Sequence, residues 1–209
     1  MSDDWRTDRI GSAHRGENPT VLRRLDAGFA VIGDTQFLPG YCVLLVDEVG
    51  VERLSDLPRG KRMGFLSDLD RLGEAVERAS RQSDAAFRRV NLEILGNTDT
   101  FLHAHVWPRF EWEPEELVAG PVWLYPEERW TSEEFALGAR HDQLREAIGV
   151  ELDQLPGIGS LSSLVSRRNR AHRMPPGPSL EYPASGRRAC ASRGRGTTGR
   201  PRRRGRRSC

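Results

Sequence analysis

The sequence predicts one α+β domain, in which two main helices pack against an antiparallel sheet of about five strands, followed by a disordered, arginine-rich C-terminal tail. Three observations support this fold class. Short apolar runs alternate with amphipathic segments in the order strand, strand, helix, strand, strand, helix. Two of the runs meet at Gly96-Asn97, a turn typical of antiparallel neighbours. The 209 residues, 37% of them hydrophobic, suffice for a single core.

The first half of the chain contains two expected strands and a long helix. The strands span residues 28–33 and 41–47, and the loop between them contains Pro39-Gly40. Residues 41–46 are apolar throughout, which predicts a central strand covered on both faces. A helix is expected over residues 58–81, because apolar residues recur there at spacings of four and three. They are Phe65, Leu69, Leu72, Val76 and Ala79.

The second half contains two further strands, expected at residues 88–95 and 101–109, and a final helix. Thr131, with Glu134 three positions later, predicts a capping box at the start of that helix. Its apolar side is formed by Leu137, Leu144 and Ile148. His141 lies among these apolar residues, which favours a buried or boundary histidine over a catalytic one.

The segment before this helix, residues 110–130, is rich in aromatic residues, prolines and glutamates. We expect it to cover a pocket or to contact a second subunit. Its aromatic side chains fit packing, and stacking on a purine is the alternative. They are Trp112, Trp123, Tyr125 and Trp130.

Residues 101–109 read Phe-Leu-His-Ala-His-Val-Trp-Pro-Arg and place two histidines two positions apart in an apolar strand. Because successive side chains of a strand point to opposite faces, His103 and His105 face one pocket or partner. Imidazole is largely neutral, nucleophilic and still protonatable near pH 7, with an unperturbed pKa of about 6.5. One ring can therefore attack phosphorus while its neighbour donates to a phosphate oxygen.

A bare pair of strand histidines also fits a structural pair or two ligands of a metal site. A zinc site needs three or four ligands. The remaining histidines, His14, His141 and His172, are scattered, and the cysteines show no Cys-x-x-Cys spacing. We therefore expect no bound metal at the histidine pair.

Residues 95–109, together with residues 37–46, resemble the histidine triad (HIT) family of nucleotide hydrolases and transferases. The family motif is His-φ-His-φ-His-φ-φ, in which φ is apolar, and Pro-Arg commonly follows. Here Phe101 replaces the first histidine, while His103 and His105 occupy the second and third positions. The resemblance implies a HIT-like catalytic domain at residues 18–153.

The catalytic set implied by the resemblance is His103, the nucleophile, with His105 and Thr98. Asn97 and Thr98 also offer uncharged donors at the entrance of the histidine strand. Their other interpretation is simple turn chemistry. Asn91 lies in the stretch from which family members place polar side chains on the phosphate and leaving group.

Two more substrate-binding residues follow from the resemblance. Asp34 is similar to the family's ribose-binding position, although the match requires a one-residue gap. Arg109 either assists substrate binding or pairs with Glu111 or Glu113.

The activity implied by the resemblance is hydrolysis or nucleotidyl transfer at the α-phosphate of a nucleoside phosphate derivative. The substrate would be a dinucleoside polyphosphate or a nucleoside phosphoramidate, and the intermediate a covalent nucleotidyl-histidine. No tightly bound cofactor is expected, and Mg²⁺ can accompany a polyphosphate substrate. The family also implies a homodimer.

The charge is divided unevenly along the chain. Residues 166–209 hold fourteen arginines and one acid, which leaves 18 basic and 29 acidic residues in positions 1–165. Residues 154–209 therefore read as a disordered basic tail, and residues 1–17 as an N-terminal extension. The tail is either an arm for nucleic acid or another polyanion, or a solvated extension without function.

Three cysteines in 209 residues do not form a disulfide framework, and Cys42 lies in an apolar strand. The first residues are polar and acidic, unlike a signal peptide, and no apolar stretch approaches the roughly 20 residues that span a bilayer. These features predict a cytoplasmic protein without a membrane partner.

Two other functions remain open at this point. Phe101, in place of the first histidine, favours a nucleotide-binding regulatory module with weak or no turnover. The basic tail favours polyanion binding. Release of AMP from nucleotide substrates separates the first from an enzyme, and deletion of residues 166–209 tests the second.

Overall fold

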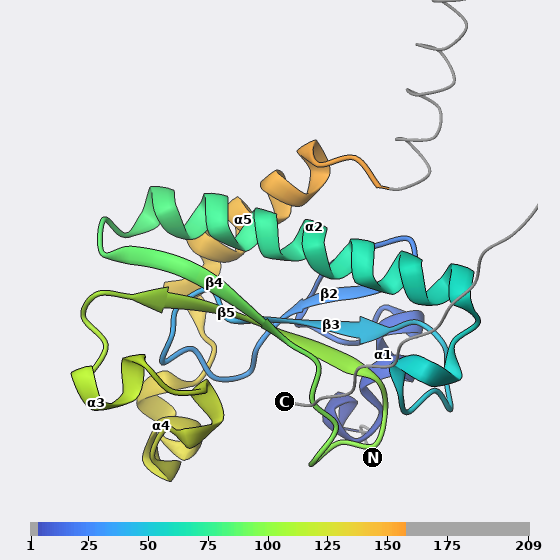
Figure 1. The fold of residues 1–209 in the computed structure, drawn as a ribbon, viewed down its shortest axis with the longest axis horizontal. Helices are drawn as coiled ribbons and strands as arrows, with labels where there is room; N and C mark the ends of the chain where they lie inside the picture. Colours follow the sequence, from blue (N-terminus) through green and yellow to red (C-terminus); the bar gives the residue numbers. More distant parts are fainter. Residues whose placement is uncertain (1–3, 158–209) are drawn as a thin grey trace, which may run out of the picture. The chain divides into compact units, whose positions relative to one another are not determined.

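The computed structural model describes residues 4–157, and within them five strands form one antiparallel sheet in the order β1-β2-β3-β5-β4 (Figure 1). The strands are β1 (Val21–Arg24), β2 (Gly28–Ile32), β3 (Cys42–Val46), β4 (Phe87–Glu93) and β5 (His103–Phe110). The predicted α+β class and the antiparallel pairing of β4 with β5 are confirmed.

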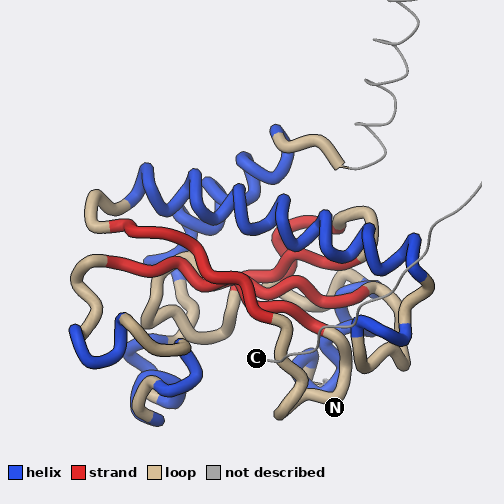
Figure 2. The backbone as a smooth tube through the Cα atoms, viewed as in Figure 1, coloured by secondary structure: helices blue, strands red, loops and turns tan. Residues whose placement is uncertain are grey.

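Two long helices cover one face of the sheet, and shorter helices lie on the other side. The long helices are α2 (Arg59–Ser83) and α5 (Asp142–Gln154). On the other side, Figure 1 shows α1 (Arg9–Arg15), α3 (Glu115–Val118) and α4 (Glu127–Thr131). Single 3₁₀ turns span Trp5–Asp8, Leu54–Asp56, Val122–Leu124, Glu133–Phe135 and Ala139–His141. The tube in Figure 2 makes the intervening layer of strands visible.

The alternation expected for the histidine strand decides which residues enter which layer. Leu102, Ala104 and Val106 are buried against α2 and α5, together with alternate residues of β2 and β3. Trp107 is buried in the second apolar layer, on the opposite face. His103 alternates with the first set and therefore lies on the face away from α2.

The central strand β3 is buried at each of its five positions, as its unbroken apolar run predicts. Cys42 is a free, fully buried cysteine. β3 pairs with β2 on one side and with β5 on the other, so that Val43 lies opposite His105 and Leu45 opposite His103.

Several features of the structure differ from the sequence-based expectation. Strand β1 and the N-terminal helices were not expected. The capping box at Thr131 is wrong, because Thr131 ends α4 and Ser132 instead accepts from the Glu134 amide at a 3₁₀ turn. The final helix starts only at Asp142, after a turn in which the buried His141 accepts from the amide of Gly138 through Nδ1. The burial of His141 was correctly predicted.

Residues before the predicted domain pack on it, since Ile10 joins one core layer and Ala13 the other. At the other end, Leu155 is buried just after α5. None of the helices within residues 4–157 is long and apolar enough to cross a membrane. The predicted basic tail lies outside the described residues from position 158 onward.

Candidate active site

A cavity of about 190 Å³ opens on the sheet face away from α2, and both histidines of β5 line it. Strands β2 and β3 supply an apolar wall, and the chain around α1, α4 and the β4–β5 connection supplies polar and aromatic groups. The lining residues are Arg9, Val31, Ile32, Gly33, Asp34, Thr35, Tyr41, Val43, Leu45, Asp99, Phe101, His103, His105 and Trp130. The structure therefore brings three of the predicted site residues together: His103, His105 and Asp34.

The ring of His103 has a defined tautomer when neutral. Its Nδ1 lies 2.8 Å from the carbonyl oxygen of Phe101. A carbonyl oxygen only accepts, so Nδ1 carries the proton and Nε2 carries the lone pair. His103 is only 6% exposed, and its exposed surface belongs to the cavity wall. An imidazole held in this way presents a nucleophilic nitrogen.

The ring of His105 lies 4.9 Å from that of His103, centroid to centroid, at 84°. Its Nδ1 lies 2.8 Å from the Tyr41 hydroxyl. Burial, together with the neighbouring His103, lowers the pKa of His105 to about 4. Burial also raises the pKa of Tyr41 far above its usual value. At neutral pH both groups are therefore uncharged.

Phe101 occupies the position of the motif's first histidine, and its ring lies 5.1 Å from the ring of His103. The phenyl group is partly buried and packs against both core layers. It lines the cavity and supplies apolar surface, whereas a histidine would supply a further polar group.

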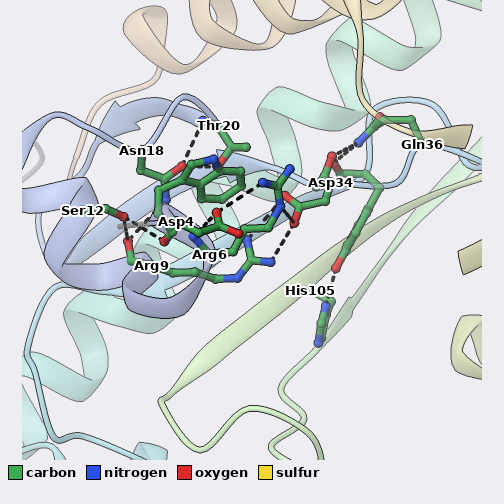
Figure 3. A network of polar contacts seen from close by, with 12 residues as sticks. Asp4, Arg6, Arg9, Ser12, Asn18, Thr20, Asp34, Gln36 and His105 are labelled. Atoms are coloured by element: carbon green, nitrogen blue, oxygen red, sulfur yellow. Dashed lines mark hydrogen bonds and ion pairs between the residues drawn. The ribbon is translucent and has the colours of Figure 1, made fainter. Parts of the chain in front are cut away.

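An ion pair forms another part of the wall. Arg9 of α1 donates to both carboxylate oxygens of Asp34, with Nη2–Oδ2 at 2.7 Å and Nη1–Oδ1 at 3.4 Å. The Nε atom of Arg6 lies 3.8 Å from the same carboxylate, and Figure 3 shows both guanidinium groups directed toward Asp34. The Asp34 carboxylate is therefore already close to two guanidinium groups.

Three predicted polar residues are not part of the cavity wall. Asn97 and Thr98 are exposed in the β4–β5 connection, and Asp99 is the member of that loop that lines the cavity. Asn91 lies opposite Trp107 in the sheet and lines a separate cavity of about 390 Å³ beside β4.

Arg109 does not line the histidine cavity, and it forms the pair with Glu113 that was the alternative expectation. Its side chain is 4% exposed, and Nη2 lies 2.8 Å from the Glu113 carboxylate. Nη1 donates to the carbonyl of Gly120 and Nη2 to that of Val118. These hydrogen bonds tie β5 to the segment that precedes α4, and in this way Arg109 stabilises the fold.

Tyr41, Arg9, Asp99 and Trp130 line the cavity but were not predicted as site residues. Tyr41 directly precedes Cys42, which pairs with Val106 of β5. Knowledge of this register would therefore have placed Tyr41 beside the histidine strand. Arg9 comes from a segment remote in sequence and carries no local signal, whereas Trp130 ends the aromatic-rich segment that was expected to cover a pocket. Within residues 4–157 no group of three or more histidines, cysteines and carboxylates could hold a metal ion.

Comparisons with protein-family models and with curated proteins give no match. Solved structures do match, at low sequence identity. A Hit-like protein involved in cell-cycle regulation from Bartonella henselae is 14% identical, with 72% of this chain and 99% of that chain covered and a TM-score of 0.52. A histidine triad (HIT) protein from Sinorhizobium meliloti is 18% identical, with 71% and 94% covered and a TM-score of 0.50.

A hypothetical histidine triad nucleotide-binding protein from Sulfolobus tokodaii is 11% identical, with 70% of this chain and 91% of that chain covered and a TM-score of 0.51. These likenesses, together with the five-stranded sheet, show that the chain has a HIT fold. The fold predicted from the motif of residues 101–109 is thus confirmed.

Proposed function

We propose that this protein is a nucleotide hydrolase or nucleotidyl transferase that acts at the α-phosphate through a covalent intermediate on His103. The observation that carries the proposal is the hydrogen bond from His103 Nδ1 to the Phe101 carbonyl, which leaves the Nε2 lone pair for the cavity. The HIT fold, with one neighbour named a nucleotide-binding protein, supports a nucleotide as the substrate class.

In the first step, the Nε2 lone pair of His103 forms a bond to the α-phosphorus while the bond from phosphorus to the leaving atom breaks. The leaving group departs with that electron pair and gains a proton from solvent where its basicity requires one. The imidazole becomes cationic. The Phe101 carbonyl, which accepts from Nδ1–H, stabilises this charge.

In the second step, water attacks the same phosphorus, the N–P bond breaks, and its electron pair returns to Nε2. The proton of the attacking water passes to solvent, and a nucleoside monophosphate leaves. If an alcohol or amine replaces water, the same intermediate yields nucleotidyl transfer.

Charge on the phosphoryl oxygens requires a donor that is fixed in advance. His105 is adjacent to His103 and uncharged at neutral pH, so that its ring N–H donates without bringing a second cation. Arg9 supplies the positive charge of the wall, and Asp34 keeps that guanidinium in place. Mg²⁺ would enter with a polyphosphate substrate, held by its phosphates.

The proposal includes the homodimer that the resemblance implies and the reducing cytoplasm that the cysteine content predicts. Sedimentation at several protein concentrations tests the first. Asn91, Asn97 and Thr98 have no role in the proposed steps, because none of them lines the cavity.

The experiment is release of AMP from a diadenosine polyphosphate and from an adenosine phosphoramidate by the full-length protein. His103→Asn should lower kcat by at least about 10³-fold, because the nucleophile has no substitute. The matched control is His14→Asn, which changes an exposed histidine outside the cavity and should leave kcat unaltered. Equal turnover in His103→Asn and the parent protein would refute the proposal.

A nucleotide-binding module without turnover is the second candidate, and Phe101 favours it. Phenyl in place of imidazole removes a polar group from the neighbourhood of the nucleophile. AMP binding by calorimetry without AMP release from either substrate would establish this function and exclude the first.

A further inference from the structure

Tyr41 connects the apolar layer of the sheet with the histidine pair. The residue is 7% exposed, and its hydroxyl lies 2.8 Å from Nδ1 of His105. Its ring stacks on that of Trp107 with 3.6 Å between centroids and 9° between planes. His105 itself is nearly parallel to Trp107, at 5.4 Å and 11°. The Trp107 ring therefore stacks against both Tyr41 and His105, the two partners of the hydrogen bond.

Trp107 is held in turn from the neighbouring strand. Its Nε1–H donates to the carboxylate of Glu93 at 3.1 Å. Glu93 pairs with His105 across the sheet, and Trp107 is 2% exposed. The indole ring is therefore held by packing and by the hydrogen bond of its Nε1–H, and the Tyr41 ring that stacks on it is restrained as well.

The backbone around Tyr41 leaves room for the ring and holds the main chain of residue 41 in place. A Cβ added to Gly33 would lie 2.2 Å from Cδ1 of Tyr41, so only glycine allows the approach. The side-chain amide of Gln36 donates to the carbonyls of Gly33 and Tyr41, both at 2.9 Å. Its oxygen accepts from the amide of Gly40 at 2.8 Å, and Figure 3 shows Gln36 beside this turn.

The contact between Tyr41 and His105 has one hydrogen and two possible directions. We infer that the hydroxyl donates and Nδ1 accepts, because a phenol O–H is a good donor and the unprotonated nitrogen of a neutral imidazole a good acceptor. A neutral ring that accepts at Nδ1 must carry its proton on Nε2. Within residues 4–157, Nε2 of His105 has no hydrogen-bond partner, and His105 lines the cavity.

We propose that Tyr41 is a positioning residue that acts through His105, holding its ring with Nε2–H free to donate to the phosphoryl group on His103. The inference rests on the proposed function for the identity of the acceptor. The tautomer and orientation of His105 do not depend on it. Tyr41 touches His105 and not the reacting atoms, so its contribution is preorganisation of a donor.

The charged surroundings of His105 fit a donor that stays neutral. His103 on the same strand adds an unfavourable interaction with any second cation. Glu93 faces it from β4, and its carboxylate is used by Trp107. Asp34, Asp99 and Arg9 are the other charged groups of the cavity wall.

The first measurement is the side-chain ¹⁵N spectrum of the full-length protein with ring-labelled histidines, in which His105→Gln assigns the resonances of residue 105. At pH 7.5 we expect Nδ1 of His105 to be an unprotonated, hydrogen-bonded nitrogen and Nε2 to carry the proton. Tyr41→Phe should move the Nδ1 resonance to the position of an unbonded lone pair. Tyr125→Phe is the matched control, because it removes a buried phenol hydroxyl that bonds Glu113 and should leave the resonance in place.

The second measurement is turnover. Tyr41→Phe should lower kcat by about 10- to 100-fold and leave KM within about threefold, since the lost interaction belongs to the transition state. In the His105→Ala background, Tyr41→Phe should change kcat by less than about threefold. A thermal melt of each variant confirms folding.

A proton on Nδ1 of His105 in the parent protein would overturn the inference. So would a loss on Tyr41→Phe that keeps its full size in the His105→Ala background, because Tyr41 would then act on its own. If the parent protein releases no AMP, the proposed function fails, and the spectrum alone decides the role of Tyr41.

Discussion

The buried carboxylate of Glu113 holds the chain that leads to the cavity wall at Trp130, and its substitution should be strongly destabilising. Both carboxylate oxygens accept from Arg109 Nε, at 3.1 and 2.9 Å. The amide of Phe110 donates to the same group at 2.6 Å, and the Tyr125 hydroxyl also donates to it. Burial and this contact raise the pKa of Tyr125 well above its usual value.

The magnitude follows from the exposure of the pair, which is 4% for the Arg109 side chain and zero for Glu113. Glu113→Gln keeps the shape but removes the charge that compensates a buried guanidinium. Breaking a buried pair from one side costs about 3–5 kcal/mol. For a domain of this size each kcal/mol lowers Tm by roughly 2–4 °C, so a decrease of roughly 6–20 °C is expected.

The assay is thermal and urea unfolding followed by circular dichroism. Glu111→Gln is the matched control, because its side chain is 68% exposed in a surface pair with Arg88. The control should change the free energy of unfolding by less than about 1 kcal/mol. A Glu113→Gln protein that melts within about 2 °C of the parent would refute the view that this cluster stabilises the domain.

Three further perturbations test the cavity and its supports. Arg9→Leu should raise KM for an anionic nucleotide by about tenfold in steady-state kinetics, because it removes the positively charged guanidinium from the cavity wall. Arg15→Gln, on the exposed side of the same helix, should leave KM unaltered. Gly33→Ala should cost about 1–3 kcal/mol in urea unfolding and reduce kcat, since the added methyl displaces the Tyr41 ring; unaltered kcat would contradict this. The pKa of His105 is about 4 in the folded protein and about 6.5 in the unfolded chain, so the unfolded chain binds more protons between these limits. The free energy of unfolding therefore decreases as the pH is lowered through that window. The decrease in unfolding free energy from pH 7.5 to 5 should be about 2 kcal/mol smaller in His105→Gln, and an equal decrease in both proteins would contradict the assignment.

The two layers of the fold could be predicted because the histidine strand and β3 carry clear patterns. Strict alternation assigns Ala104 and Val106 to one layer and His105 to the other, and the unbroken run of β3 requires cover on both faces. β1 could not be predicted in the same way. It is a short edge strand with two arginines among its four residues and one buried side chain, Leu22.

Failure of the predicted capping box has a local cause. Thr131 and Glu134 have the right spacing, but proline at position 126 starts the short α4 upstream of them. The chain then needs two 3₁₀ turns before α5 begins at Asp142. A capping pattern identifies a helix start only where the following residues continue the helix.

The candidate site was predictable where its residues share one strand and one fold motif. His103 and His105 are adjacent on one face of β5, and Asp34 follows β2 closely enough to reach the same cavity. Asn91, which was expected from the resemblance alone, pairs with Trp107 across the sheet and lines a different cavity from that of the histidines.

The remaining wall could not be predicted, because its members are brought together only by tertiary packing. Arg9 reaches Asp34 across 25 positions of sequence, and Trp130 packs at 5.8 Å against Trp107. An aromatic residue beside an apolar strand, such as Tyr41, fits a core position as well as a polar contact. Its hydroxyl contact appears only when β3 and β5 are paired.

Trapping of the intermediate tests the central assignment most directly. Full-length protein is mixed with a diadenosine polyphosphate, quenched in alkali during turnover, digested and examined by mass spectrometry. The mechanism requires a nucleotidyl group on the peptide that contains His103, absent from His103→Asn and present in His14→Asn. Turnover with no adduct at position 103, or an adduct on another residue, would contradict it.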